Sequence, residues 1–174
     1  EGEPFWVSSD LCDLIDAANK SVVDYIPTEN TFPARSGCIT FTTPIGLRLG
    51  GAEVHTTDGA MAMRQMAWGI VGDRGFYVAR VDDDGIHPWF WLWASVLGRD
   101  AWIEGAETLT TKNAYEDMLS IGCGGLAATV FAILSQRLVR YSTAEADRPT
   151  RRRADRAGLA LRQIRVVHLR HIDY

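Results

Sequence analysis

Hydrophobic and polar residues follow two different periods along this chain, which predict helices and strands within one protein. After Ser8 or Ser9, either of which can cap a helix, apolar residues recur every three or four positions until Pro27 ends the pattern. They are Leu11, Leu14, Ile15, Ala18, Val22 and Ile26. A second helix is predicted within residues 116–140 from a similar apolar stripe. That stripe consists of Leu126, Val130, Ile133, Leu134, Leu138 and Val139.

Other segments alternate with a period of two or form short apolar runs, which is typical of strands. Residues 37–43 predict a strand that Pro44 closes. The apolar runs 61–71 and 76–81 flank four turn-forming residues and predict a β-hairpin. The imperfect alternation over 162–170 predicts a final strand.

Turn and loop residues separate these elements. The segment Asp82-Asp83-Asp84-Gly85 has the composition of a hairpin turn. Residues 142–150 have loop composition, with Pro149 as a helix breaker, and a short helix is predicted over 151–160.

Together these elements predict an α+β fold. At 174 residues the chain is expected to form a single domain, 1–174, whose basic C-terminal segment covers 148–174. A mixed or mostly antiparallel sheet built from 37–96 would pack against two main helices, the N-terminal one and the one over 126–140.

The formal charge is distributed unevenly along the chain. The last 38 residues hold ten arginines, no lysine and four acidic residues, a charge of +6. The first 136 residues hold 8 basic and 18 acidic residues, a charge of −10. An acidic body with a basic tail indicates an anionic partner, which is either an external polyanion or the body itself.

The arginines between positions 148 and 156 are the strongest candidate for a binding site. They are Arg148, Arg151, Arg152, Arg153 and Arg156. Guanidinium groups make bidentate hydrogen bonds to phosphate oxygens, and several of them together release counterions from nucleic acid. The alternatives are a solvated helix face and a clamp onto the acidic body.

An aromatic cluster at Trp89, Trp91 and Trp93 is a second candidate, for binding a partner. Alternation places the three tryptophans on one face of a strand, where they could stack on bases or anchor a protein. Aromatic residues on the opposite face of the same segment favour a core position instead.

No other motif carries recognisable chemistry. The segment Gly122-Cys123-Gly124-Gly125-Leu126-Ala127 lacks the preceding strand and the following acid of a dinucleotide site, so no cofactor is expected. The four histidines, the three cysteines and the acidic turn lack metal-ligand spacing, so no metal is expected. No catalytic signature such as G-x-S-x-G is present, which disfavours an enzyme.

The same sequence features bear on location. The longest apolar stretch, near 89–97, is too short to span a bilayer, and the first residues have no basic segment of a signal peptide. Three widely spaced cysteines disfavour a disulfide framework. We therefore expect a cytoplasmic protein with no membrane partner.

Three stretches are similar to a family of uncharacterised proteins of actinobacteria, their phages and their mobile elements. The stretches are Phe32-Pro33-Ala34-Arg35-Ser36-Gly37-Cys38-Ile39-Thr40-Phe41-Thr42-Thr43-Pro44-Ile45, then Ala67-Trp68-Gly69, and then 148–158 followed by 164–170. The likeness covers about residues 25–170. It implies a mobile-element context and no particular activity.

The leading hypothesis is a non-enzymatic regulatory or interaction protein of a mobile genetic element. Its arginine segment would contact nucleic acid or another polyanion, such as an acidic protein surface. Two alternatives stay open: a protein-binding inhibitor or self-assembling subunit, and a small metal-independent nuclease-like toxin.

Overall fold

The computed structural model describes residues 2–21, 32–49, 52–56, 59–70, 76–82, 85–87 and 125–170. The main sheet contains β1 (Glu3–Val7), β2 (Ser36–Gly46), β7 (Ala62–Ile70), β8 (Phe76–Asp82), β9 (Gly85–His87), β10 (Val139–Glu145) and β11 (Gln163–Leu169). Two short ribbons pair β3 (Arg48–Leu49) with β4 (Ala52–Glu53), and β5 (His55–Thr56) with β6 (Gly59–Ala60). The described helices are α1 (Ser9–Asn19), helix 125–134 and α4 (Arg148–Arg156).

The seven strands of the main sheet are ordered β10-β11-β1-β2-β7-β8-β9. Strand β1 is parallel to both of its neighbours, β11 and β2, whereas the other four strand pairs are antiparallel. Helix α1 supplies the crossover that two parallel strands require between β1 and β2. A mixed sheet with separate helices confirms the predicted α+β class.

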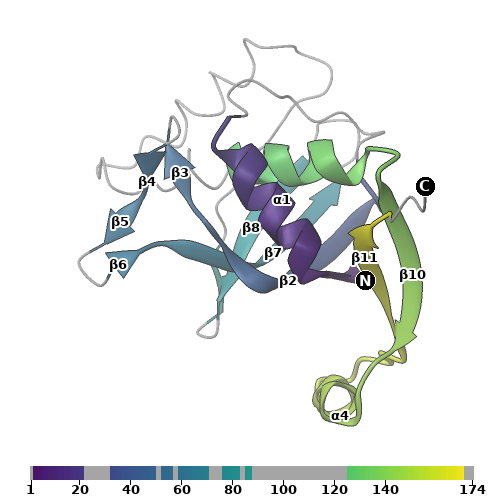
Figure 1. Ribbon diagram of the computed structural model, residues 1–174. Coiled ribbons are helices and arrows are strands. Elements are labelled where there is room, and N and C mark those ends of the chain that lie inside the picture. The colour runs from purple at the N-terminus through teal and green to yellow at the C-terminus, as the bar shows by residue number, and fades with distance from the viewer. Residues whose placement is uncertain are drawn as a thin grey trace.

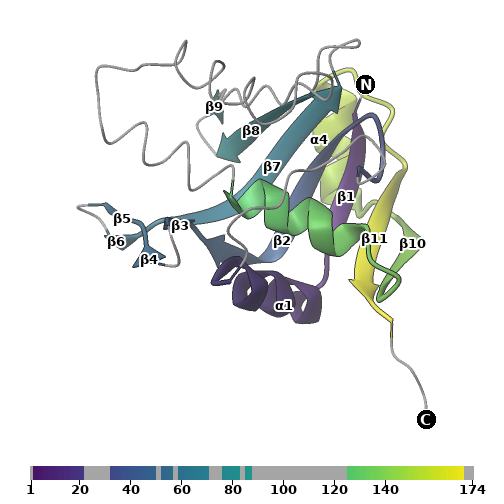
Figure 2. The same ribbon diagram turned by 90° about the horizontal axis from the view of Figure 1, so that it is seen from above.

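One face of the sheet is covered by helices. Figure 1 shows α1 and helix 125–134 above the sheet, and α4 below it at the turn that joins β10 to β11. Figure 2, seen from above, shows the same two helices over the strands, with α4 farther from the viewer. The two main helices therefore lie on one side of the sheet, and α4 lies on the other.

The hydrophobic core lies between the sheet and these two helices. Trp68 of β7 is at its centre: its ring centroid is 5.4 Å from that of Phe5 and 5.5 Å from that of Phe131, and its Nε1 donates to the carbonyl oxygen of Ala34 at 3.0 Å. Among the described residues, the largest completely buried side chains are Trp68, Phe5, Phe131, Leu11, Ile15, Ile39, Ile45, Leu47, Met63, Met66 and Leu126. Burying these apolar surfaces supplies the main driving force for folding.

The predicted N-terminal helix is shorter in the structure than its apolar pattern. It begins after Ser8 and ends at Asn19, where the amides of Lys20 and Ser21 bond to carbonyls three residues earlier. Asn19 is buried, and its Nδ2 donates to the carbonyl oxygen of Gly46 at 3.1 Å. This contact joins the end of α1 to β2. Residues 22–31, which contain the last positions of the predicted apolar pattern, lie outside the described residues.

The strand predicted over 37–43 continues three residues further, through Pro44 to Gly46. The pairing between β2 and β7 shifts register between Thr40 and Ile45. Proline is tolerated at such an irregularity because its missing N–H removes no regular ladder hydrogen bond.

The loop predicted over 142–150 is wrong. Residues Val139–Glu145 form β10, and α4 already begins at Arg148. Among the described strands, β10 pairs only with β11, so it lies at the edge of the sheet. Edge strands tolerate polar residues on both faces, which explains why this strand has the composition of a loop.

Candidate nucleic-acid interface

Helix α4 carries the five arginines, and local signals at both of its ends define it. Asp147 is the N-cap residue, and its side chain accepts a hydrogen bond from the amide of Thr150 at 2.8 Å. At the C-terminal end, Gly158 has a φ of 73°, a conformation that favours glycine. The amide of Leu159 donates to Ala154 at 2.9 Å and that of Gly158 to Asp155 at 3.1 Å, which is a Schellman motif. These caps fix a nine-residue helix despite its five like charges.

The arginines of α4 point mainly away from the protein. Ala154 is the buried residue of the helix, whereas Arg148, Arg152, Arg153 and Arg156 are exposed, and Arg151 is half-buried. Spacings of i, i+4 and i+8 place Arg148, Arg152 and Arg156 along one stripe of the helix. Ala154 lies on the opposite side, so this stripe faces solvent.

The five arginines form no ion pair with the described acidic residues. Asp155, the acid within α4, instead lies 3.5 Å from Arg162. Hydrogen bonds from Thr150 lower the pKa of Asp147, and the charges of Arg153 and Arg151 lower it further. The arginine segment therefore does not clamp onto the described acidic body, and its charge is available to an external anion.

Arg165 of the same basic tail has a different environment. Its Nη1 lies 2.8 Å from Oε2 of Glu3, and its guanidinium carbon lies 5.3 Å and 5.6 Å from the ring centroids of Phe5 and Tyr141. This arginine joins β11 to β1 and belongs to the fold. The ten arginines of the basic tail thus differ in role: Arg165 belongs to the fold, whereas half of them form a mostly exposed group on α4.

The sheet presents a second surface, which sequence reasoning missed, on the side away from α1 and helix 125–134. Trp6 of β1 lies there, with 40% of its surface exposed, while its neighbours Phe5 and Val7 point into the core. The signal in the sequence was weak because Phe5-Trp6-Val7 shows no alternation of apolar and polar residues. We call this surface the helix-free face because it lacks the two main helices, although α4 lies on the same side of the sheet.

Strand register identifies the other residues of the helix-free face, because directly paired residues point to the same side. Trp6 pairs with Thr40 and Val166, and the pairing continues outward across the sheet. The described side chains on this face are Pro4, Trp6, Ser36, Cys38, Thr40, Gln65, Ala67, Ala79, Val81, Arg140, Ser142, Ala144, Ile164, Val166 and His168. None of these described residues is acidic, although the protein as a whole carries a formal charge of −4.

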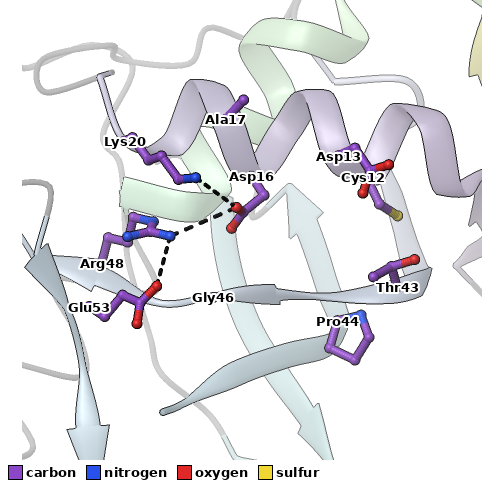
Figure 3. Close-up of a pocket in the computed structure, with 10 residues that line it drawn as sticks. All are labelled: Cys12, Asp13, Asp16, Ala17, Lys20, Thr43, Pro44, Gly46, Arg48 and Glu53. Carbon is purple, nitrogen blue, oxygen red and sulfur yellow. Dashed lines mark hydrogen bonds and ion pairs between the residues drawn. The ribbon is translucent and has the colours of Figure 1, made fainter.

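A pocket of about 400 Å³ lies between α1 and the second half of β2 (Figure 3). Its lining contains both signs of charge. Nη2 of Arg48 lies 3.1 Å from Oε1 of Glu53 and 3.8 Å from Oδ2 of Asp16, and Nζ of Lys20 lies 3.5 Å from the same Asp16 oxygen. Because acids of the pocket itself neutralise both cations, the pocket is a poor site for a polyanion, and α4 is the better one.

The predicted tryptophan site lies outside the described residues. Trp89, Trp91 and Trp93 fall there, as do Gly122, Cys123 and Gly124 of the glycine-rich segment. Their role as a partner-binding site therefore stays a prediction.

The described histidines and cysteines do not gather into a metal site. No group of three metal-ligating side chains is present in the described part of the chain. Exposed His55 lies 3.7 Å from Glu53, and the buried Nε2 of His168 has no hydrogen-bond partner in the described structure. Cys12 and Cys38 are free thiols; Cys12 is buried, and burial raises the pKa of Cys38.

Comparison of the chain with protein-family models, with curated proteins and with solved structures gives no match. None of the described helices combines the length and the apolar character needed to cross a membrane.

Proposed function

We propose that this protein binds nucleic acid through α4, as a non-enzymatic regulatory or interaction protein. The observation that carries the proposal is the solvent-facing stripe of Arg148, Arg152 and Arg156, which has no acidic partner among the described residues. Guanidinium groups one helical turn apart can each contact a phosphate oxygen. The resemblance to mobile-element proteins agrees with a nucleic-acid partner.

The caps of α4 support this proposal energetically. Arginines at i and i+4 repel one another, which weakens an isolated helix. Asp147 at the N-terminus and the Schellman motif at Gly158 oppose that repulsion, and Arg153 and Arg156 in the last turn interact favourably with the helix dipole. The protein thus holds like charges close together in a fixed geometry, which suits an anionic ligand.

Salt-dependent binding tests the proposal. Fluorescence anisotropy of a labelled 20-nucleotide strand would be measured between 50 and 200 mM salt. Three phosphate contacts predict a loss in affinity of about twentyfold over this range, because each contributes about 0.7 to the slope of log K against log salt for a single strand. Replacing Arg148, Arg152 and Arg156 by Gln should reduce that slope by about 2.

A charge-matched control separates α4 from general electrostatics. The triple variant Arg35→Gln, Arg64→Gln and Arg137→Gln removes three exposed arginines that lie outside α4 and should leave the slope almost unchanged. Equal slopes for the two triple variants, or no binding at 50 mM salt, would exclude α4 as the binding element. An intact probe after incubation would exclude the nuclease alternative, and light scattering on the same samples would show whether self-assembly accompanies binding.

A further inference from the structure

We infer that the ligand of this site is single-stranded nucleic acid, and that Trp6 on the helix-free face stacks on one of its bases. This inference rests on the proposed nucleic-acid binding by α4 and adds the class of ligand. It joins two surfaces that are far apart in sequence, the arginine stripe of α4 and the exposed tryptophan of β1.

The position of Trp6 is the first argument. β1 lies inside the sheet between β11 and β2, where a large aromatic residue would normally be covered, yet 40% of the Trp6 surface is exposed. Its directly paired neighbours, Thr40 and Val166, have small side chains. A partly exposed indole offers a flat surface on which an unpaired base can stack.

Charge complementarity is the second argument. The helix-free face has no acid among its described side chains, although acidic residues outnumber basic ones in the whole chain. Arg140 is exposed on this face, where it pairs with His168 across β10 and β11. Next to Trp6 a polyanion would therefore meet no carboxylate among the described side chains of this face, although Ala79 and Ile164 of the same face are buried.

The arrangement of the two surfaces is the third argument. α4 lies on the side of the sheet away from α1 and helix 125–134 (Figure 1). Because Phe5 and Val7 point into the core, Trp6 between them points to that same side. The chain leaves α4 and enters β11 at Gln163, and Val166, the partner of Trp6, follows three residues later. At about 3.3 Å per residue this is roughly 10 Å of strand, a distance that a few nucleotides can span.

Stacking on Trp6 requires an unstacked base, which a duplex does not offer without the cost of opening. A duplex could contact the arginines of α4 but would leave Trp6 unused. The combination of both surfaces therefore selects a single strand, in which bases and phosphates are accessible together.

Binding of a labelled 20-nucleotide oligothymidylate, of an oligouridylate of equal length and of the thymidylate–adenylate duplex would test the inference. We expect at least one single strand to bind more tightly than the duplex. Comparing the oligothymidylate with the oligouridylate then shows whether the protein prefers single-stranded DNA or RNA. Trp6→Ala should weaken single-strand binding about tenfold and leave duplex binding unchanged. Trp6→Phe should restore most of the lost affinity, because a phenyl ring still stacks.

The salt slope distinguishes stacking from charge. Trp6→Ala should lower the affinity without changing the slope, since no phosphate contact is removed, whereas the α4 triple variant should change the slope. Leu138→Ala removes a side chain with 42% of its surface exposed, located in the turn before β10, and should have no effect on binding. Thermal unfolding of each variant confirms that the fold is retained.

Two outcomes would overturn the inference alone: a duplex bound as tightly as both single strands, or a Trp6→Ala variant with the affinity of Leu138→Ala. If the α4 triple variant binds every probe as the unmodified protein does, the proposed function itself fails. The failure of the single-strand inference is therefore distinguishable from the failure of nucleic-acid binding.

Discussion

Arg165 and Glu3 form an ion pair with 2.8 Å between Nη1 and Oε2, although 162 residues separate them in sequence. The same guanidinium lies over the ring of Phe5. β11 is thus joined to β1 by a side-chain contact as well as by its backbone ladder. Position on the fold, rather than residue type, decides which arginines of the basic tail are available for binding.

Replacing Arg165 with Gln should lower stability without affecting binding. The ion pair and the cation–π contacts are half-exposed, so we expect the free energy of unfolding to fall by about 1 kcal/mol. Urea unfolding would measure this, and anisotropy would show unchanged affinity for the oligonucleotide. Arg152→Gln is the matched comparison. It should weaken binding of the oligonucleotide and leave the free energy of unfolding almost unchanged. A larger binding defect for Arg165→Gln than for Arg152→Gln would contradict this division.

Gly37→Ala should destabilise the core. A Cβ at this position would lie 2.4 Å and 2.6 Å from Cη2 and Cζ2 of Trp68, and 2.8 Å from the carbonyl oxygen of Glu3. The Trp68 ring cannot move easily, because it is buried and its Nε1 is bonded to Ala34. Overpacking of this kind costs about 1–3 kcal/mol. Chemical denaturation would measure it, with Gly125→Ala as the control, since a Cβ there meets nothing within 4 Å.

Sequence periodicity predicts correctly the elements whose own residues show a helical or strand-like order of apolar and polar positions. The pairing of β7 with β8 and the strand β11 follow from apolar runs bounded by turns, and the ends of α4 lie three and four residues from those of the helix predicted over 151–160. Each of these signals is local, because it depends on which residues are apolar and where glycine or proline interrupts them.

The strands that were missed depend on tertiary context. In β1, Trp6 is apolar but faces outward, so the strand has no alternation, and its burial pattern appears only when both neighbouring strands are in place. In β10, an edge position permits a polar sequence. The exposure of the α4 arginines could not be predicted from the sequence, because it depends on which side of the helix is buried, and only the structure shows that this is the side of Ala154. Trp6, whose outward position removes the alternation of β1, is also the residue that we infer to stack on a base.

Acid should loosen the start of α4. Hydrogen bonds from Thr150 are the main reason that the pKa of Asp147 lies below its usual range. A lowered folded-state pKa means that the carboxylate stabilises α4 above the pKa of the unfolded chain, near 4, and that this stabilisation is lost as pH falls through the folded-state value. NMR Cα shifts of α4 should therefore move toward coil values below about pH 4.

Asp147→Asn is the control for this titration. Asparagine is as good an N-cap as aspartate but has no carboxyl group to protonate, so α4 of this variant should stay helical over the same pH range. Identical pH profiles for the variant and the unmodified protein would show that another group controls the helix.

Cys38 should report occupation of the helix-free face. It lies on that face, opposite Pro4 of β1 and Ala67 of β7, and burial raises its pKa. The thiolate is the reactive form, so alkylation by iodoacetamide should be slow near pH 8 and should accelerate only at higher pH. A bound single strand that reaches Trp6 would cover the neighbouring Cys38 and slow the reaction further.

Site-resolved mass spectrometry would measure this protection, with Cys12 as an internal reference because it is buried in the core and should stay unmodified with or without ligand. Oligothymidylate should slow alkylation of Cys38 severalfold at a concentration that saturates anisotropy. The duplex at the same occupancy should not, because it contacts α4 and leaves the sheet uncovered. If both ligands protect Cys38 equally, the helix-free face does not discriminate between strands. If neither ligand does, binding is confined to α4, and Trp6 has no part in it.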